Sequence, residues 1–248
     1  MRTVISLCGR KRTGKESAFK CIQQYVQRPE EFQFATPLKK FCIEVLGLTH
    51  DQCYGPSECR ESATKYTWGG IDTKIREKYG KKPEDIMTAR DVLQVVGTDL
   101  MRQQFFENVW AEGGIREALR SSAKTCVYSD TRFPNEIEVT KRTSLMDREF
   151  GDSILIRLYR RTGLEDSHES ETALDVYDLY PNQRAIESKD HPVLLDLGYE
   201  KVSDSLWRGN SSLVYDYLID NNHSLDTLRK NMLFVLREQG IYQEPDCS

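Results

Sequence analysis

Apolar runs of strand length alternate along the chain with segments whose apolar residues recur at helical spacing. The first run, residues 3–8, precedes a helical pattern formed by Ala18, Phe19, Ile22, Tyr25 and Val26. Four further short runs complete a set of five predicted strands, at 32–36, 125–129, 153–159 and 214–219. Strands that alternate with helices predict an α/β fold built on a parallel five-stranded sheet.

Helices are predicted at 38–48, from Pro134 onward, and over 88–106 with Thr88 as the N-cap. At about 100° per residue, the helix over 88–106 has two faces. The predicted core face carries Val92, Leu93, Val96 and Leu100. The opposite face carries Arg90, Gln94, Gly97 and Met101. A mid-helix glycine costs about 1 kcal/mol relative to alanine, so we expect another group to approach the backbone at Gly97; the alternative is a solvated polar face.

A last helix is predicted to begin after Ser224 as its N-cap. Its predicted buried stripe is Leu225, Leu228, Met232 and Val235. The polar, turn-rich residues from about 49 to 83 fit no predicted sheet element and are interpreted as an insertion. At 248 residues the chain suits one α/β domain, so we predict a single domain over 1–248 with this insertion.

Composition excludes several classes of function. Hydrophobic residues make up 38% and charged residues 30%, and no apolar run approaches the roughly 18 residues that cross a membrane. The first strand starts directly after Met1 and Arg2, which predicts a cytoplasmic protein without a signal peptide. A net charge of −4 disfavours a nucleic-acid polymer as partner. The seven dispersed cysteines include no Cys-x-x-Cys pair and predict reduced thiols.

The most specific chemical signal follows the first strand, where Gly9-Arg10-Lys11-Arg12-Thr13-Gly14-Lys15 matches a phosphate loop, Gly-x-x-x-x-Gly-Lys. Glycines let successive backbone N–H groups face the phosphates of ATP or GTP, and Lys15 adds positive charge from the next helix. The alternative is a chance glycine-rich turn. Glu16 stands where a magnesium-binding Ser or Thr is usual, and Ser17 follows it, so either residue could serve the ion.

Polar residues also gather where later strands end. Asp130 and Arg132 follow the predicted strand at 125–129. Ligands of open α/β sheets bind beyond the carboxyl ends of the strands, which places both residues beside the phosphate loop if the sheet is parallel. Asp130 could orient magnesium-bound water, or else cap a helix. Arg160 and Arg161 precede an acidic stretch that could act as a mobile lid, with a solvated loop as the alternative.

Six motifs together carry a family resemblance: GRKRTGKES, FATPLKK, RDVLQVVGTDLMRQQFFENVW, SDTRFPNE, SHESE and YLIDNNHSLDTL. On these motifs the sequence resembles the viral, chiefly bacteriophage, deoxynucleoside monophosphate kinases, which are P-loop nucleotide kinases. The resemblance implies a P-loop NTPase fold of three layers, α/β/α, with helical or irregular insertions and a lid with an extension over about 160–209. In that family an acidic residue and then a hydroxyl follow the loop lysine, usually Asp and Thr, where this chain has Glu16 and Ser17.

The resemblance also implies roles for individual residues. ATP is expected to bind the loop and one later residue near the adenine: Gly9, Lys11, Arg12, Thr13, Gly14, Lys15, Glu16, Ser17 and Asn221. The deoxynucleoside monophosphate is expected to bind Lys39, Arg90, Gln94, Gly97, Thr98, Trp110, Asp130, Arg132 and Glu136. The catalytic residues are expected to be Lys15, Arg90, Asp130, Arg132 and Arg161, with Arg160 as an alternative to Arg161. Mg²⁺ is expected at Glu16, Ser17 and Asp130.

The implied reaction moves the γ-phosphoryl group of ATP to a deoxynucleoside monophosphate, in the cytoplasm of an infected host cell. Two alternatives are a kinase of small molecules that resembles dephospho-coenzyme A kinase, and a non-catalytic module that senses ATP. The resemblance covers residues 49–83 and 175–209 poorly. These segments could contact the base or another subunit, and a homodimer is an open alternative, but surface elaboration packed on Tyr177, Tyr180 and Trp207 is favoured.

Overall fold

The computed structural model describes residues 2–147, 150–161, 172–176 and 191–244. The chain divides into two compact units. Unit 1 comprises Met1–Phe34 together with Ile115–Ser248, and unit 2 is Ala35–Gly114. The sequence prediction of a single domain over 1–248 stays a prediction, and the predicted insertion lies entirely within unit 2.

Unit 1 is built on a seven-stranded sheet in the order β2-β5-β1-β6-β9-β8-β7. Five strands run parallel: β2 (Pro29–Phe32), β5 (Thr125–Thr131), β1 (Thr3–Cys8), β6 (Asp152–Tyr159) and β9 (Tyr217–Asp220). Two antiparallel strands extend the edge beyond β9, namely β8 (Leu206–Arg208) and β7 (Glu200–Ser203). The parallel α/β prediction is therefore confirmed, but five strands is too few, because β7 and β8 form within the 175–209 segment.

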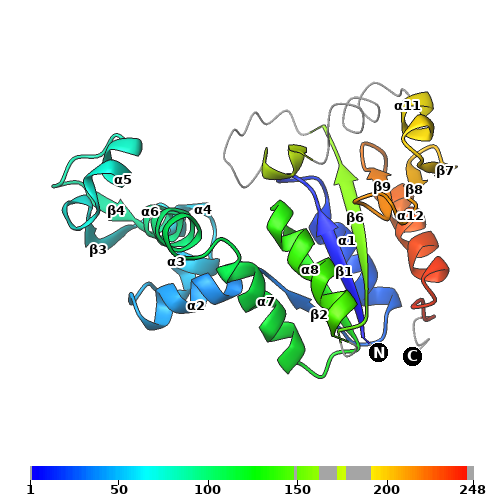
Figure 1. Ribbon diagram of the computed structural model, residues 1–248, viewed down its shortest axis with the longest axis horizontal. Helices are drawn as coiled ribbons and strands as arrows, with labels where there is room; N and C mark the ends of the chain where they lie inside the picture. Colours follow the sequence, from blue (N-terminus) through cyan, green and yellow to red (C-terminus); the bar gives the residue numbers. More distant parts are fainter. Residues whose placement is uncertain (1, 148–149, 162–171, 177–190, 245–248) are drawn as a thin grey trace. The chain divides into compact units, whose positions relative to one another are not determined.

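Helices cover both faces of this sheet (Figure 1). One face packs against α1 (Lys15–Tyr25) and α12 (Leu225–Glu238), with Ile5, Leu7 and Ile156 among the buried strand residues. The other face packs against α8 (Pro134–Met146), η3 (Ala173–Val176) and α11 (His191–Asp196). Successive residues of β6 alternate between the two cores, as the period of a strand requires. The result is a three-layer α/β/α arrangement.

Unit 2 contains short helices and a two-stranded sheet. The helices are α2 (Thr36–Glu44), α3 (His50–Tyr54), α4 (Ser57–Arg60), η1 (Trp68–Gly70), α5 (Thr73–Lys78), α6 (Ala89–Gln94) and the π-helix η2 (Val95–Phe105). The strands β3 (Ala63–Thr67) and β4 (Ile86–Thr88) pair antiparallel. A separate core surrounds the fully buried Trp68 and Met87. Helix α7 (Val109–Arg120) starts in unit 2 and ends in unit 1.

Several element boundaries differ from the sequence predictions. The strand predicted at 32–36 is wrong in position, since β2 ends at Phe32 and α2 already begins at Thr36. Pro37 lies in the first turn of α2, where proline is favoured, rather than ending a strand. The insertion, predicted without a strand, contains β3. The predicted strand at 214–219 begins only at Tyr217.

The helix over 88–106 is confirmed with Thr88 as its N-cap, but it changes register on the way. From Val95 it is a π-helix, whose wider turn invalidates the 100° count. Val95 and Asp99 are consequently buried, whereas Val96 and Leu100 are only half-buried. In α12 the N-cap Ser224 is confirmed, but Leu225 is exposed and does not belong to the buried stripe of Leu228, Met232 and Val235.

Within the residues that the structure describes, no helix is long and apolar enough to cross a membrane.

Candidate active site

The phosphate loop connects the carboxyl end of the central strand β1 to α1, in the order that the sequence predicts. Atoms close to Gly9 and Gly14 leave no room for a side chain at either position. A Cβ at Gly9 would lie 2.4 Å from Thr13 Oγ1. A Cβ at Gly14 would lie 2.1 Å from Asn221 Nδ2, and the backbone there has a φ of 102°, in the region that favours glycine. The loop backbone therefore admits no side chain at either end.

The loop is closed by its own side chains. Lys15 Nζ donates hydrogen bonds to the carbonyl oxygens of Gly9 at 2.5 Å and Arg10 at 2.8 Å. Thr13 is buried, and its hydroxyl donates to the Arg10 carbonyl at 2.9 Å. The lysine ammonium is thus held across the loop, where it would meet the phosphates of a nucleotide. Lys11 and Arg12 are exposed on the same loop.

Asn221 lies at the end of β9 and holds the loop from the sheet side. Its Nδ2 donates to the Thr13 carbonyl at 2.8 Å, and its backbone N–H donates to the Tyr159 carbonyl at 2.8 Å. The side chain is buried. Asn221 is expected near the donor adenine, which stays a prediction, and the structure brings it into direct contact with the phosphate loop.

The two residues after the loop lysine face different surroundings. The Glu16 side chain is 84% exposed and pairs with Lys20 one turn later, at 2.8 Å. This hydrogen bond and charge lower the pKa of the Glu16 carboxyl. Ser17 is half-buried in the first turn of α1. Glu16 is therefore turned to solvent and paired, whereas Ser17 is partly covered at the start of α1.

Three predicted residues lie at the junction of β5 and α8, where β5 runs on to Thr131 and so includes Asp130. Asp130 Oδ1 accepts a hydrogen bond from the Phe34 backbone N–H at 2.9 Å. Glu136 is buried, and its Oε2 accepts from the backbone N–H groups of Arg132 at 2.7 Å and Phe133 at 3.1 Å. Glu136 therefore caps the start of α8.

A cavity of about 20 Å³ adjoins the phosphate loop in unit 1. It is lined by Arg10, Thr13, Arg157, Leu158, Tyr159, Arg160 and Asn222. Arg157 is a buried residue of β6 that sequence reasoning missed, and its guanidinium lies 5.2 Å from the centre of the Tyr159 ring. A lone arginine inside the apolar run 153–159 is the signal that could have revealed it.

The expected lid falls mostly outside the described residues, which omit 162–171. Its first residues are described. Arg160 lines the small cavity, and the Arg161 backbone N–H donates to Asn222 Oδ1 at 2.7 Å. The carboxyl edge of unit 1 thus brings together the phosphate loop, Asn221, Asp130, Arg132 and Arg160, as the parallel sheet predicted.

The other expected substrate-binding residues belong to unit 2. Arg90, in the first turn of α6, donates from Nε to Glu61 and from Nη2 to Ser57 Oγ at 3.3 Å. Lys39 Nζ lies 4.4 Å from the centre of the Tyr54 ring. Both partners of Arg90 and the ring of Tyr54 come from the insertion, so this segment is built against the predicted substrate-binding residues.

The group that approaches Gly97 is a neighbouring side chain. A Cβ at this position would lie 2.7 Å from Leu38 Cδ2. The Gly97 carbonyl accepts a hydrogen bond from Trp110 Nε1 at 2.9 Å, and Trp110 is buried. Packing within unit 2 therefore accounts for the glycine. Gln94 and Thr98, on the same helix, are half-buried.

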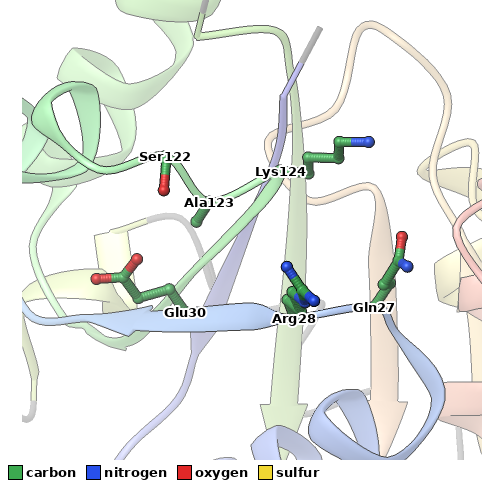
Figure 2. A pocket seen from close by; sticks show the side chains of 6 residues that line it. All are labelled: Gln27, Arg28, Glu30, Ser122, Ala123 and Lys124. Atoms are coloured by element: carbon green, nitrogen blue, oxygen red, sulfur yellow. The ribbon is translucent and has the colours of Figure 1, made fainter.

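A larger cavity lies elsewhere, at the amino ends of β2 and β5 (Figure 2). It has a volume of about 360 Å³ and is lined by Gln27, Arg28, Glu30, Ser122, Ala123 and Lys124. None of these residues was predicted to bind substrate, and the phosphate loop leaves the sheet from the opposite edge. The predicted site residues of unit 1 therefore lie at the carboxyl edge of the sheet, away from this cavity.

Among the described residues, no group of three or more His, Cys, Asp or Glu side chains could hold a metal ion. Cys8, Cys21, Cys42, Cys53 and Cys126 are buried thiols, and Cys59 is half-buried. Cys247 lies outside the described residues.

Comparison with known proteins adds independent evidence. No family model matches the sequence. The deoxynucleoside-5'-monophosphate kinase of Escherichia phage T5 is 24% identical, in an alignment that covers 70% of this chain and 86% of that protein. A protein of Acanthamoeba polyphaga mimivirus, provisionally named deoxynucleotide monophosphate kinase, is 30% identical over 69% of this chain and 81% of its own length. Together with the phosphate loop on a parallel α/β sheet, these relatives show that the chain belongs to the deoxynucleoside monophosphate kinase family.

Proposed function

We propose that this protein transfers the γ-phosphoryl group of ATP to a deoxynucleoside monophosphate and releases ADP and a deoxynucleoside diphosphate. The observation that carries the proposal is the closed phosphate loop at the end of β1. Its glycines exclude side chains, and Lys15 lies across it on two loop carbonyls. This geometry suits a nucleoside triphosphate, whose phosphates would draw Lys15 away from those carbonyls.

Unit 1 supplies the donor side of the proposed reaction. The loop N–H groups and Lys15 bind the β- and γ-phosphates, with Lys11 and Arg12 as further cations on the loop. Arg160 and Arg161 follow β6 directly, and either could stabilise the negative charge of the transferred group. Arg157 adds a buried positive charge to the small cavity beside the loop.

The donor set at the loop also fits Mg²⁺, which prefers oxygen ligands and keeps several waters and phosphate oxygens around it. Ser17 and Asp130 supply a hydroxyl and a carboxylate from the start of α1 and the end of β5. Glu16 fits less well, because its exposed carboxylate pairs with Lys20. When bound, the ion would neutralise charge on the phosphates.

The acceptor needs little activation by the protein. A phosphomonoester has a second pKa of about 6, so its attacking oxygen is largely ionised at neutral pH. The main difficulty is to bring two polyanions together in line, for which the chain offers Arg90 and Arg132 as forked donors to the acceptor phosphate. Gln94 and Thr98 lie further along the helix that carries Arg90 in its first turn, and suit contacts to the nucleoside.

Preference for deoxyribose is the finer part of the proposal. An apolar wall at the sugar would leave a 2′-hydroxyl unpaired and so disfavour ribonucleotides. Trp110 suits such a wall, because its only polar group already donates to the Gly97 carbonyl. Equal turnover of dGMP and GMP would remove this part of the proposal.

The test is ADP production from Mg-ATP with a panel of deoxy- and ribonucleoside monophosphates. Dephospho-coenzyme A and a reaction without acceptor are the controls. Turnover with several deoxynucleotides supports the proposal and sets the range of bases. Turnover with dephospho-coenzyme A alone would favour the small-molecule kinase, and ATP binding without turnover would favour the sensing module.

A further inference from the structure

Arg90 is held by two side chains of the insertion along one edge of its guanidinium. Its Nε donates to a Glu61 carboxylate oxygen, and its Nη2 donates to Ser57 Oγ. Nε and Nη2 lie along one edge of the planar guanidinium group, which we call the side edge. Within the described part of the chain the Arg90 side chain has no other hydrogen bond, and 39% of it remains exposed.

The remaining N–H groups of the guanidinium belong to Nη1 and Nη2, which form its end edge. A guanidinium carries five N–H donors in a fixed plane. Glu61 and Ser57 engage one donor on Nε and one on Nη2, which leaves both donors of Nη1 and the second donor of Nη2. Nη1 and Nη2 form the end edge, which matches two oxygens of a phosphate.

The local fold fixes Glu61 and Arg90 relative to each other. Ala63 of β3 pairs with Thr88 of β4, and the Ala89 backbone N–H donates to the Ser62 carbonyl at 3.0 Å. Glu61 and Arg90 each lie two residues beyond this strand pair. At the other end, the Glu61 backbone N–H donates to the Ser57 carbonyl at 3.1 Å. A short sheet and α4 therefore set the position of the carboxylate.

We propose that Glu61 and Ser57 are positioning residues that hold the side edge of Arg90, so that its end edge binds the acceptor phosphate. The insertion at 49–83 is then part of acceptor recognition rather than surface elaboration. This inference rests on the proposed function, in which Arg90 binds the phosphate of a deoxynucleoside monophosphate.

The test compares Glu61→Ala and Glu61→Gln with the wild type in steady-state kinetics. Loss of the carboxylate frees the arginine to rotate, so we expect KM for the deoxynucleotide to rise about tenfold, comparable to one lost hydrogen bond to a charged group. KM for ATP should stay unchanged. Glu61→Gln keeps an oxygen that accepts from Nε, so it should recover most of the loss.

Glu58→Ala is the matched control, because Glu58 is an exposed carboxylate of α4, the helix that Glu61 follows directly, and it has no ion pair among the described residues. It should behave as the wild type. Both members of the Arg90–Glu61 pair are partly exposed, and such pairs add little stability, so the midpoint of thermal unfolding should be nearly unchanged in every Glu61 variant.

Three results would overturn the inference. An unchanged deoxynucleotide KM in Glu61→Ala would make the pair a surface contact, and a lower KM would make Glu61 a competitor of the acceptor phosphate. A parallel rise in KM for ATP would indicate a general structural effect. Two further results separate this failure from failure of the proposed function. If Arg90→Ala turns over deoxynucleotides as well as the wild type does, Arg90 does not bind the acceptor phosphate and the inference fails, while the proposed function stands. If the wild type turns over no deoxynucleotide, the proposed function itself is wrong.

Discussion

Asn221 connects the last parallel strand to the phosphate loop across 208 positions of sequence, through its hydrogen bond to the Thr13 carbonyl. Replacement by alanine leaves that carbonyl without its partner, at a cost of about 1–3 kcal/mol. If the loop then relaxes, Asn221→Ala should raise KM for ATP about tenfold and leave KM for the deoxynucleotide unchanged. Steady-state kinetics with each substrate varied in turn measures both values.

Asn231→Ala provides the control for this prediction. Asn231 lies in α12 and is also buried, and its Nδ2 donates to Ser205 Oγ at 2.9 Å. Its replacement should lower stability without any change in KM for ATP. Equal effects of the two substitutions on KM would mean that Asn221 acts only through general stability.

Arg132 offers a different test at the residue scale, because its backbone and side chain are expected to have separate roles. The backbone N–H donates to Glu136, and any substituted residue except proline can keep that bond. Removal of a positioned arginine in phosphoryl transfer costs about three to five orders of magnitude in kcat. Arg132→Ala should therefore lose nearly all turnover while ATP binding, measured by calorimetry, is retained. Unchanged turnover would exclude Arg132 from the mechanism.

The unit of strand, loop and helix formed by β1 and α1 is the element on which the proposed function depends. Gly14 has a φ of 102°, and a Cβ there would lie 2.1 Å from Asn221 Nδ2. Gly14→Ala should therefore distort the loop and abolish ATP binding. Gly80 is a matched control, since it has a φ of 63° and no atom within 4 Å of an added Cβ.

Gly80→Ala should cost only about 1–2 kcal/mol, the penalty of a left-handed backbone, and should bind ATP normally. Calorimetric titration with ATP, together with thermal unfolding of both variants, measures the contrast. Normal ATP affinity in Gly14→Ala would show that the loop tolerates a side chain and would argue against its close fit to phosphate.

Elements with strong local signals were predicted well, and those that depend on tertiary pairing were not. Residues 3–8 form β1 as predicted, because a short apolar run before a glycine-rich loop admits few alternatives. The exposed edge strand β2 carries two glutamates and has little strand signal of its own. In β3, exposed and half-buried residues alternate, so this polar segment carries no apolar pattern that predicts its pairing with β4.

The candidate site was likewise predicted only in part. Motif residues at the carboxyl edge of the sheet could be predicted, because parallel strands bring their ends together. The contacts that those residues make could not be predicted from the sequence. The roles of Asn221 as a support of the loop and of Glu61 as the partner of Arg90 both depend on the folded positions of distant backbone segments.

At the scale of the whole molecule, each compact unit has its own core and its own buried thiols. Cys8, Cys21 and Cys126 lie in unit 1, and Cys42 and Cys53 lie in unit 2. Burial raises the pKa of the Cys42 thiol to about 12 and that of Cys126 to about 11, so neither forms the reactive thiolate readily in the native state. In the native protein, Cys59 should react before these five.

Thiol labelling in increasing urea, mapped by mass spectrometry, therefore reports the unfolding of each unit. Because the cores are separate, we expect the two sets of thiols to become reactive at different urea midpoints. A single common midpoint would show that the chain unfolds as one cooperative domain, which is what the sequence predicted.

In the proposed reaction the γ-phosphoryl group of ATP passes to a deoxynucleoside monophosphate. Incubation with γ-³²P-labelled ATP, magnesium and one deoxynucleoside monophosphate at a time, followed by chromatography, follows that group directly. We predict label in the deoxynucleoside diphosphate with the wild type and none with Lys15→Ala. Label that remains in ATP with every deoxynucleoside monophosphate, or that appears only as inorganic phosphate, would contradict the proposed reaction.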